Sequence, residues 1–114
     1  MSATIRGISS MATRALLAEL AAEHKQRSGM AVAFESVGGV DAAKRVLAGE
    51  AFDLVVLASD AVDKLIAAGR VLAGSRVDLL RSGVAVAVRA GAARPDLSSE
   101  DAVRSAVLAA PSIG

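Results

Sequence analysis

Three times in its first 70 residues, an apolar run passes through a turn of serine, glycine or aspartate into a helix that ends at glycine. The turns fall at residues 9–10, 36–41 and 59–60, and the closing glycines are Gly29, Gly49 and Gly69. Glycine is typical just past the last turn of a helix, because it accepts a left-handed backbone there. Three successive strand–helix units predict a parallel α/β sheet with right-handed crossovers.

The apolar runs also predict where the strands and helices lie. Strands are expected at residues 3–8, 30–36 and 52–58, and helices at residues 11–27, 41–48 and 61–68. The second strand is almost continuously apolar, which is typical of a strand covered on both faces. Asp41 is expected to cap the second helix. In the first helix, one apolar stripe is expected to pack on the sheet: Met11, Ala15, Leu16, Leu20 and Ala21.

Small aliphatic residues must form nearly all of the core. Hydrophobic residues make up 54% of the chain, but Phe34 and Phe52 are its only aromatic residues. A core of alanine, valine, leucine and isoleucine lets helices approach a sheet closely. The expected fold class is therefore α/β, a three-layer sandwich with a mainly parallel sheet and helices on both faces.

Composition also excludes several classes of function. A net charge of +1 and the absence of tryptophan and tyrosine leave no basic, base-stacking surface for nucleic acid. The chain has no cysteine, so it has neither a disulfide nor thiol chemistry. No apolar run reaches the ~18 residues that cross a membrane. His24 is the only histidine, and we expect it on the surface of the first helix, because a metal site or a triad needs further partners.

The rhythm changes after the third unit. Two β-like runs follow at residues 76–80 and 84–89, with only three residues between them. No helix fits into that space, so one of the two runs is expected to join the sheet antiparallel or at its edge.

A last helix is expected at residues 100–109, with Ser98 or Ser99 as its cap and acidic residues in its first turn. The residues after it look like the approach to another strand. We therefore expect a first lobe at residues 1–91 and the start of a truncated second lobe at residues 92–114. The chain is expected to be a fragment or one half of a larger unit.

The three turns carry the residues that we expect to bind a ligand. In open α/β sheets, ligands bind outside the carboxyl ends of the strands, where these turns lie. Serine hydroxyls there donate hydrogen bonds, and the amides of Gly38 and Gly39 allow close approach. Together with the free N–H groups of helix N-termini, they can hold an anion without a charged side chain. The expected ligand-binding residues are Ser9, Ser10, Met11, Ser36, Val37, Gly38, Gly39, Val40 and Ser59.

Simpler roles exist for some of these residues. Ser9, Ser10, Ser59 and Asp60 are all residue types that commonly cap helices, and the Asp60 carboxylate would repel an anion. The glycine pair at residues 38–39 lacks the known phosphate-loop patterns. A set of plain helix caps is therefore the alternative to a binding site.

No catalytic residues are expected. The acidic residues are scattered, and the sequence contains neither paired carboxylates nor a recognisable metal-binding or cofactor-binding motif. Arg6 on the first strand and Arg14 one turn into the first helix lie on either side of the Ser9–Ser10 turn, so either could bind a carboxylate ligand. We expect both as solvated surface residues.

Four segments in this order resemble one family. In the first, a strand runs into Ser-Ser-Met at residues 9–11 and then into a long helix. The second is residues 36–49, Ser-Val-Gly-Gly-Val-Asp-Ala-Ala-Lys-Arg-Val-Leu-Ala-Gly, and the third is residues 52–60, Phe-Asp-Leu-Val-Val-Leu-Ala-Ser-Asp. In the fourth, residues 74–76 lead to the β-like run at residues 84–88. This order is similar to the N-terminal lobe of type II periplasmic solute-binding proteins, and closest to the molybdate-binding branch.

The resemblance implies a small anionic ligand, an oxyanion or an organic carboxylate, held between two lobes of which this chain supplies the first. It also implies the membrane subunits of an ABC transporter as partners, and no cofactor. The family is periplasmic, but the first residues do not read as a signal peptide, so a cytoplasmic location stays open. The molybdate branch has hydroxyls where this chain has Gly38, Gly39 and Val40, which favours a small organic acid.

Two further hypotheses belong beside this one. Some proteins of this fold are isomerases of small carboxylic acids, so the first alternative is an isomerase-like enzyme acting on a di- or tricarboxylic acid. The second is a truncated lobe that binds nothing alone and pairs with its missing half or with another copy of the chain.

Overall fold

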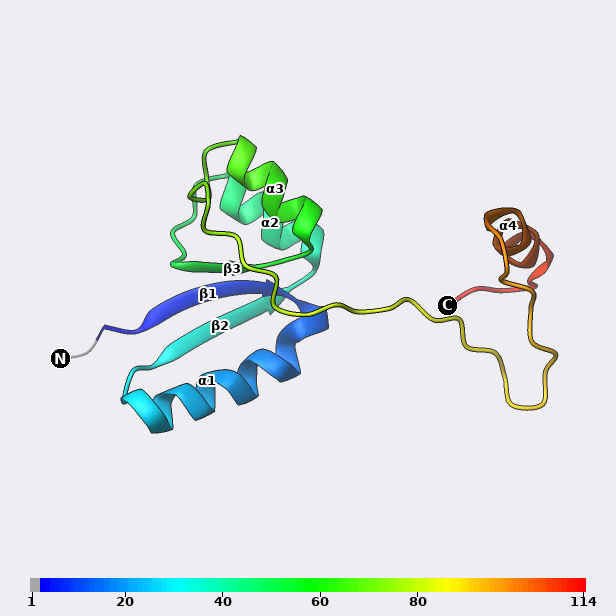
Figure 1. Ribbon diagram of the computed structural model, residues 1–114, viewed down its shortest axis with the longest axis horizontal. Helices are drawn as coiled ribbons and strands as arrows, with labels where there is room; N and C mark the ends of the chain where they lie inside the picture. The colour runs from blue at the N-terminus through cyan, green and yellow to red at the C-terminus, as the bar shows by residue number, and fades with distance from the viewer. Residues whose placement is uncertain (1–2) are drawn as a thin grey trace. The chain divides into compact units, whose positions relative to one another are not determined.

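A computed structural model describes residues 3–114 of the chain (Figure 1). One compact unit extends to Leu80, and a second runs from Arg81 to Gly114. The elements of the first unit are β1 (Ile5–Ser10), the short 3-10 helix η1 (Met11–Thr13), α1 (Arg14–Ser28), β2 (Val32–Val37), α2 (Gly39–Leu47), β3 (Leu54–Val56) and α3 (Ser59–Ala67). The second unit contains α4 (Glu100–Ala109).

The three strands form a parallel sheet in the order β2-β1-β3, so β1 is its central strand. Ser9 of β1 lies opposite Ser36 of β2 and, on its other side, opposite Val56 of β3. The carboxyl ends of the strands therefore share one edge. The predictions of an α/β fold and of parallel strand–helix units are confirmed.

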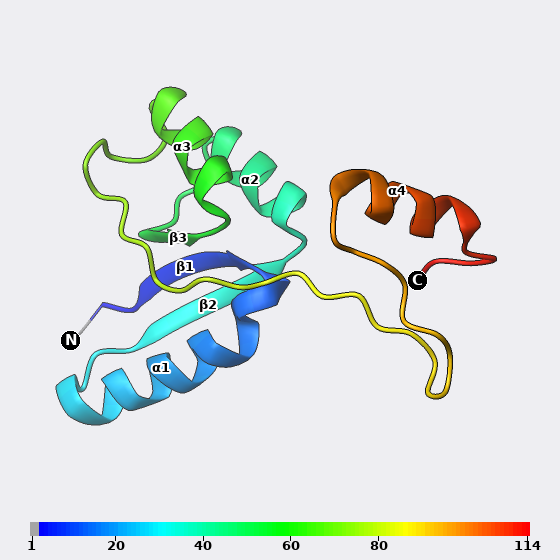
Figure 2. The same ribbon diagram turned by 45° about the vertical axis from the view of Figure 1, so that its right-hand side comes forward.

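The helices of the first unit lie on both sides of this sheet. α1 lies along β2 on one side, and α2 and α3 lie together on the other (Figures 1 and 2). On the α2 side, Ile8 and Ala42 are fully buried, and Val46 and Leu65 are nearly so. The core is thus aliphatic, as predicted, and Phe52 packs only at its margin.

On the α1 side of the sheet, the Phe34 ring covers the backbone of β1. A Cβ placed at Gly7 would lie 2.6 Å from the Phe34 Cδ1 atom, so any larger residue there would have to displace the ring. Ser9 and Ser36 each follow two residues later on the same strands and therefore face the same side. A close aromatic contact and a pair of hydroxyls are thus adjacent on this face.

β3 is shorter than the strand predicted at residues 52–58. It spans only Leu54–Val56, because Asp53 makes a different pair of contacts with β1. The Asp53 carboxylate accepts a hydrogen bond from the Arg6 amide at 2.9 Å, while the Asp53 amide donates to the Arg6 carbonyl at 2.8 Å. A side chain therefore satisfies the amide that a longer strand would have paired.

α2 and α3 begin two residues before the predicted positions, at Gly39 and Ser59. Their N-caps are Gly38 and Ala58. Asp41 consequently lies in the first turn of α2, and the prediction that it caps this helix was wrong.

The predicted apolar stripe of α1 was wrong for Leu16 and Leu20, whereas Met11 and Ala21 do face β2. Leu17 is the buried residue of this helix, whereas Leu16 and Leu20 are 36% and 42% exposed. Alanines and leucines occur on all sides of this helix, so the apolar pattern of its sequence does not indicate which face packs on the sheet. β2 was also expected to be covered on both faces, but Glu35 is exposed because β2 is an edge strand.

The two β-like runs at residues 76–80 and 84–89 do not form strands, and neither do residues 111–114. The valines of the second run are exposed: Val84, Val86 and Val88. Such sequences have strand-like composition, but a strand needs a hydrogen-bonding neighbour, and in residues 3–114 neither run has one. The prediction that one of them joins this sheet was wrong.

α4 begins where the sequence predicted it. The Ser99 hydroxyl accepts a hydrogen bond from the Ala102 amide at 3.0 Å, and Glu100 and Asp101 lie in the first turn. The cap prediction is confirmed for Ser99. None of the helices in the described part of the chain is both long and apolar enough to span a membrane.

Candidate functional site

The first two turns meet at the carboxyl edge of the sheet. Ser9 and Ser10 at the end of β1 pair in register with Ser36 and Val37 at the end of β2. A Cβ placed at Gly39 would lie 3.8 Å from the Ser10 Cβ, which brings the start of α2 to the end of β1. These two turns therefore form one continuous surface.

The third turn lies on the other side of β1. Val56 of β3 is opposite Ser9, and α3 begins three residues later at the exposed Ser59. Within residues 3–114, no hydrogen bond links the Ser59 side chain to the first two turns. Ser59 shares their edge of the sheet without a side-chain hydrogen bond to them.

The hydroxyls of Ser9 and Ser36 form the centre of this surface. Their Oγ atoms are 2.7 Å apart, and the Ser9 hydroxyl also donates to the Ser10 carbonyl at 3.0 Å. Ser9 is fully buried, whereas Ser36 is partly exposed. Either hydroxyl of this pair can be the donor, and when Ser9 donates to the Ser10 carbonyl, the Ser36 hydroxyl donates to Ser9. Ser36 can turn that proton toward a ligand only if the pair reorganises.

The helix starts at this edge have no side-chain caps. Ser10, Gly38 and Ala58 occupy the N-caps of η1, α2 and α3, and none of them makes a side-chain cap hydrogen bond. The alternative that Ser9, Ser10, Ser59 and Asp60 are helix caps was therefore wrong. Ser10 stands at an N-cap position, but its side chain makes no cap hydrogen bond. The first N–H groups of each helix are left to water or to a ligand.

Acidic residues distinguish the three helix starts. Asp41 and Asp60 lie in the first turns of α2 and α3, where a carboxylate favours the helix dipole but repels a second anion. The first turns of η1 and α1 contain no acidic residue. The end of β1 is therefore the most favourable of the three places for an anion.

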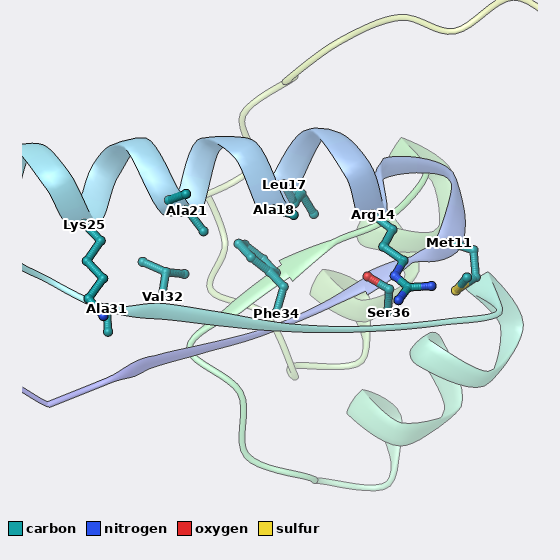
Figure 3. A pocket seen from close by; sticks show the side chains of 11 residues that line it. Met11, Arg14, Leu17, Ala18, Ala21, Lys25, Ala31, Val32, Phe34 and Ser36 are labelled. Atoms are coloured by element: carbon teal, nitrogen blue, oxygen red, sulfur yellow. The ribbon is translucent and has the colours of Figure 1, made fainter.

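A groove of about 620 Å³ runs between α1 and β2 (Figure 3). Arg14 extends toward the end of the groove where Met11 and Ser36 lie, and Lys25 lies at the opposite end (Figure 3). The remaining lining residues are apolar: Leu17, Ala18, Ala21, Ala22, Ala31, Val32 and Phe34.

Sequence reasoning assigned no role to this groove and placed Arg14 in bulk solvent. Arg14 is exposed, but it lines the groove one turn from the serine pair. Arg6 differs, because its guanidinium donates to the Ala51 carbonyl at 3.5 Å and lies 5.2 Å from the centre of the Phe52 ring, near the start of β1. The sequence signal for the groove is the helical spacing of Met11, Arg14, Ala18, Ala21 and Lys25.

His24 lies exposed on α1, as predicted. Its carbonyl accepts a hydrogen bond from the Ser28 hydroxyl at 2.7 Å. Among residues 3–114, no three His, Asp or Glu side chains are grouped to hold a metal ion. The chemistry visible at the carboxyl edge is therefore hydrogen bonding by hydroxyls and amides, with one arginine beside them.

Comparison with known proteins gives this surface a family context. The sequence pattern described as bacterial extracellular solute-binding protein matches residues 5–113. An aconitate isomerase from a Pseudomonas species is 35% identical over 115 residues, covering 96% of this chain and 44% of that protein. The chain thus spans less than half the length of this relative. No solved structure matches the chain. The chain belongs to the family of bacterial extracellular solute-binding proteins.

Proposed function

We propose that this chain binds a small anion at the carboxyl edge of its sheet, as the ligand-contacting part of a two-lobe solute-binding protein. The observation that carries the proposal is the Ser9–Ser36 pair, in which hydroxyls of neighbouring strands lie 2.7 Å apart beside uncapped helix N–H groups. Membership of a solute-binding family supports it. The proposed contacts are Ser10, Met11, Ser36, Val37, Gly38, Gly39, Val40 and Ser59. Ser9 is fully buried and acts through its hydrogen bond to Ser36.

A small organic carboxylate fits this surface better than molybdate or another tetrahedral oxyanion. Residues 38–40 offer backbone amides but no hydroxyl, and a tetrahedral anion needs donors from several directions. A planar carboxylate presents two oxygens that a few donors can satisfy. Its hydrocarbon part would lie against apolar side chains such as Met11, which lines the adjoining groove.

A second lobe would complete the site. In this proposal residues 1–91 form a three-layer lobe, residues 92–114 begin the other lobe, and the ligand lies between them. The relative's greater length supports this arrangement. Enclosure between lobes excludes water and strengthens each hydrogen bond, so we expect the 114-residue chain alone to bind weakly. The membrane subunits of an ABC-type uptake system would then receive the ligand.

An isomerase of a small tricarboxylic acid is the second candidate function. The similarity to an aconitate isomerase over 96% of the chain favours it. Moving the double bond of such an acid requires a base that removes a proton from one carbon while a proton is returned to another. The carboxylates available at this edge are Asp41 and Asp60, which lie in the first turns of α2 and α3.

Amide chemical shifts measured by NMR test the binding proposal even when affinity is low. The 114-residue chain is titrated with molybdate, citrate and trans-aconitate. We expect the two carboxylates to shift the amides of Ser10, Met11 and Gly39 at lower concentrations than molybdate does. Uniformly small shifts, or shifts centred elsewhere, would contradict the proposal.

The enzyme is tested in the same samples. In heavy water, an isomerase that moves a proton between carbons exchanges deuterium into trans-aconitate and forms the cis isomer. Loss of that exchange in Asp41→Asn or Asp60→Asn would identify the base. Binding without exchange or isomerisation would favour the solute-binding function.

A further inference from the structure

We infer that Arg14 anchors a carboxylate group of the ligand at the mouth of the α1–β2 groove and thereby selects polycarboxylates over other small anions. This inference rests on the proposed function, since it adds a charged contact to the hydroxyl and amide surface. The ligand class is a short di- or tricarboxylic acid. One carboxylate occupies the serine turn, and a second pairs with the Arg14 guanidinium.

The position of Arg14 supports this role. It is the first residue of α1, directly after the η1 turn that follows Ser10. Its side chain extends to the end of the groove where Ser36 lies (Figure 3). Ser36 is hydrogen-bonded to the buried Ser9 and lines the groove, so the guanidinium and the Ser36 hydroxyl lie at the same end of it. A guanidinium presents several donors in a fixed plane, which matches the geometry of a carboxylate.

Arg14 makes no ion pair or side-chain hydrogen bond with any of residues 3–114. Arg27, Arg45 and Arg76 each lie within 2.6–3.1 Å of a carboxylate oxygen. Other arginines of residues 3–114 also have no ion pair, but Arg14 is the arginine that lines this groove. No acidic residue lines the groove, and its two charged residues, Arg14 and Lys25, are both cations. The groove is therefore complementary to an anion.

The helix itself gains nothing from a cation at this point. The N-terminal end of a helix carries partial positive charge, so an arginine in the first turn is electrostatically unfavourable. No acidic residue in the first turn of α1 offsets it. Arg14 therefore lies where the dipole of α1 disfavours a cation, and it has no ion-pair partner among residues 3–114. A ligand carboxylate that pairs with Arg14 would explain this position.

Lys25 provides a matched control. It lies eleven residues after Arg14 in α1, a rise of about 16 Å along the helix axis. A short tricarboxylic acid held at the serine turn cannot reach it. Removing the Lys25 charge changes the net charge of the groove by the same amount as removing the Arg14 charge, but leaves the proposed contact intact.

The test compares Arg14→Gln, Arg14→Lys and Lys25→Gln in the full 114-residue chain, with tricarballylate and acetate as probes followed by NMR. We expect Arg14→Gln to weaken tricarballylate binding about tenfold or more, the effect of losing a charge-assisted hydrogen bond. Arg14→Lys should recover part of that loss. Lys25→Gln should change affinity less than twofold, and acetate binding should respond little to any of the three. The melting temperature of Arg14→Gln should be equal to or above that of the parent chain.

Each outcome separates this inference from the proposed function. Equal loss in Arg14→Gln and Lys25→Gln would show general attraction by charge and overturn the inference. Unchanged tricarballylate affinity in Arg14→Gln, with the Ser10 amide still shifting, would overturn it while the proposed binding site stands. Absence of any carboxylate-dependent shift in the parent chain would overturn both.

Discussion

Ser9 and Ser10 are adjacent hydroxyls with different surroundings. Ser9 is fully buried and hydrogen-bonded to both Ser36 and the Ser10 carbonyl. Ser10 occupies an N-cap position without making the cap hydrogen bond. One serine is therefore part of the internal structure, and the hydroxyl of the other makes no hydrogen bond with residues 3–114.

This difference predicts opposite results for two alanine substitutions. Ser9→Ala removes a buried hydrogen-bonding group and leaves Ser36 without its partner, so we expect it to lower the free energy of unfolding by about 1–3 kcal/mol. Ser10→Ala should leave stability nearly unchanged and weaken carboxylate binding. Urea denaturation and NMR titration measure the two effects. A comparable stability loss in both variants would mean that Ser10 has a structural role after all.

At the scale of single residues, the sequence indicated the types of groups at the carboxyl edge but not their pairing. The position of Ser9 and Ser36 at the ends of apolar runs was sufficient to predict a shared edge. Their direct contact depends on strand register, which a one-residue shift would have destroyed. The place of Arg14 beside them depends on how α1 is rotated, and an alanine-rich helix does not encode that rotation in its apolar pattern.

Arg45 of α2 connects β2 and the loop after α2 on the α2 side of the sheet. Its guanidinium lies 2.6 Å from carboxylate oxygens of both Glu35 on β2 and Glu50 after α2. It also lies 5.5 Å from the centre of the Phe52 ring, whose surroundings include Arg6 at 5.2 Å. The hydrogen bond from Arg45 holds the pKa of Glu35 below its ordinary value of 4.5, and the two acids raise the pKa of Arg45.

This cluster predicts a pH dependence of stability. Because the pKa of Glu35 is lower in the folded chain than in the unfolded chain, its contribution is fully present above about pH 4.5 and is lost as the pH falls through the folded value. The free energy of unfolding, measured by urea denaturation between pH 6 and pH 3, should therefore fall less steeply with decreasing pH in Glu35→Gln than in the parent chain. Parallel pH profiles would show that the ion pair is too well solvated to contribute.

At the scale of elements, the sequence predicted the order and type of the helices α1 to α4 and of the three strands that form the sheet, but it did not separate the 3-10 turn η1 from α1. The prediction was wrong where a segment needs a neighbouring strand to form its own structure. Residues 76–80 and 84–89 have the composition of strands, but composition does not state whether a neighbouring strand is present to accept their hydrogen bonds. The start of α2 at Gly39 depends on the backbone geometry of the turn, which an acidic residue nearby does not determine.

The whole chain separates into two units, and the sheet, the groove and the serine pair all belong to the first. Deleting residues 81–114 should therefore leave the melting temperature of the first unit within a few degrees of the parent value. It should also reduce self-association, because it removes the exposed apolar side chains of Val84, Val86, Leu108 and Ile113.

Thermal melts followed by circular dichroism and light scattering at several concentrations check both expectations. The matched control keeps the full length and replaces Val84 and Val86 with lysine. Loss of a cooperative melt on deletion would show that the second unit supports the first. A strictly monomeric parent chain at high concentration would contradict the association.

The central position of β1 also sets an order of assembly. Both pairings of the sheet involve this strand, which is the first to be synthesised. The contact between Ser9 and Ser36 closes 27 residues of chain, whereas that between Arg6 and Asp53 closes 47. The longer closure costs only about half a kcal/mol more in chain entropy. β1 and β2 can therefore pair while β3 is still on the ribosome, and the serine pair of the proposed site would form before the sheet is complete.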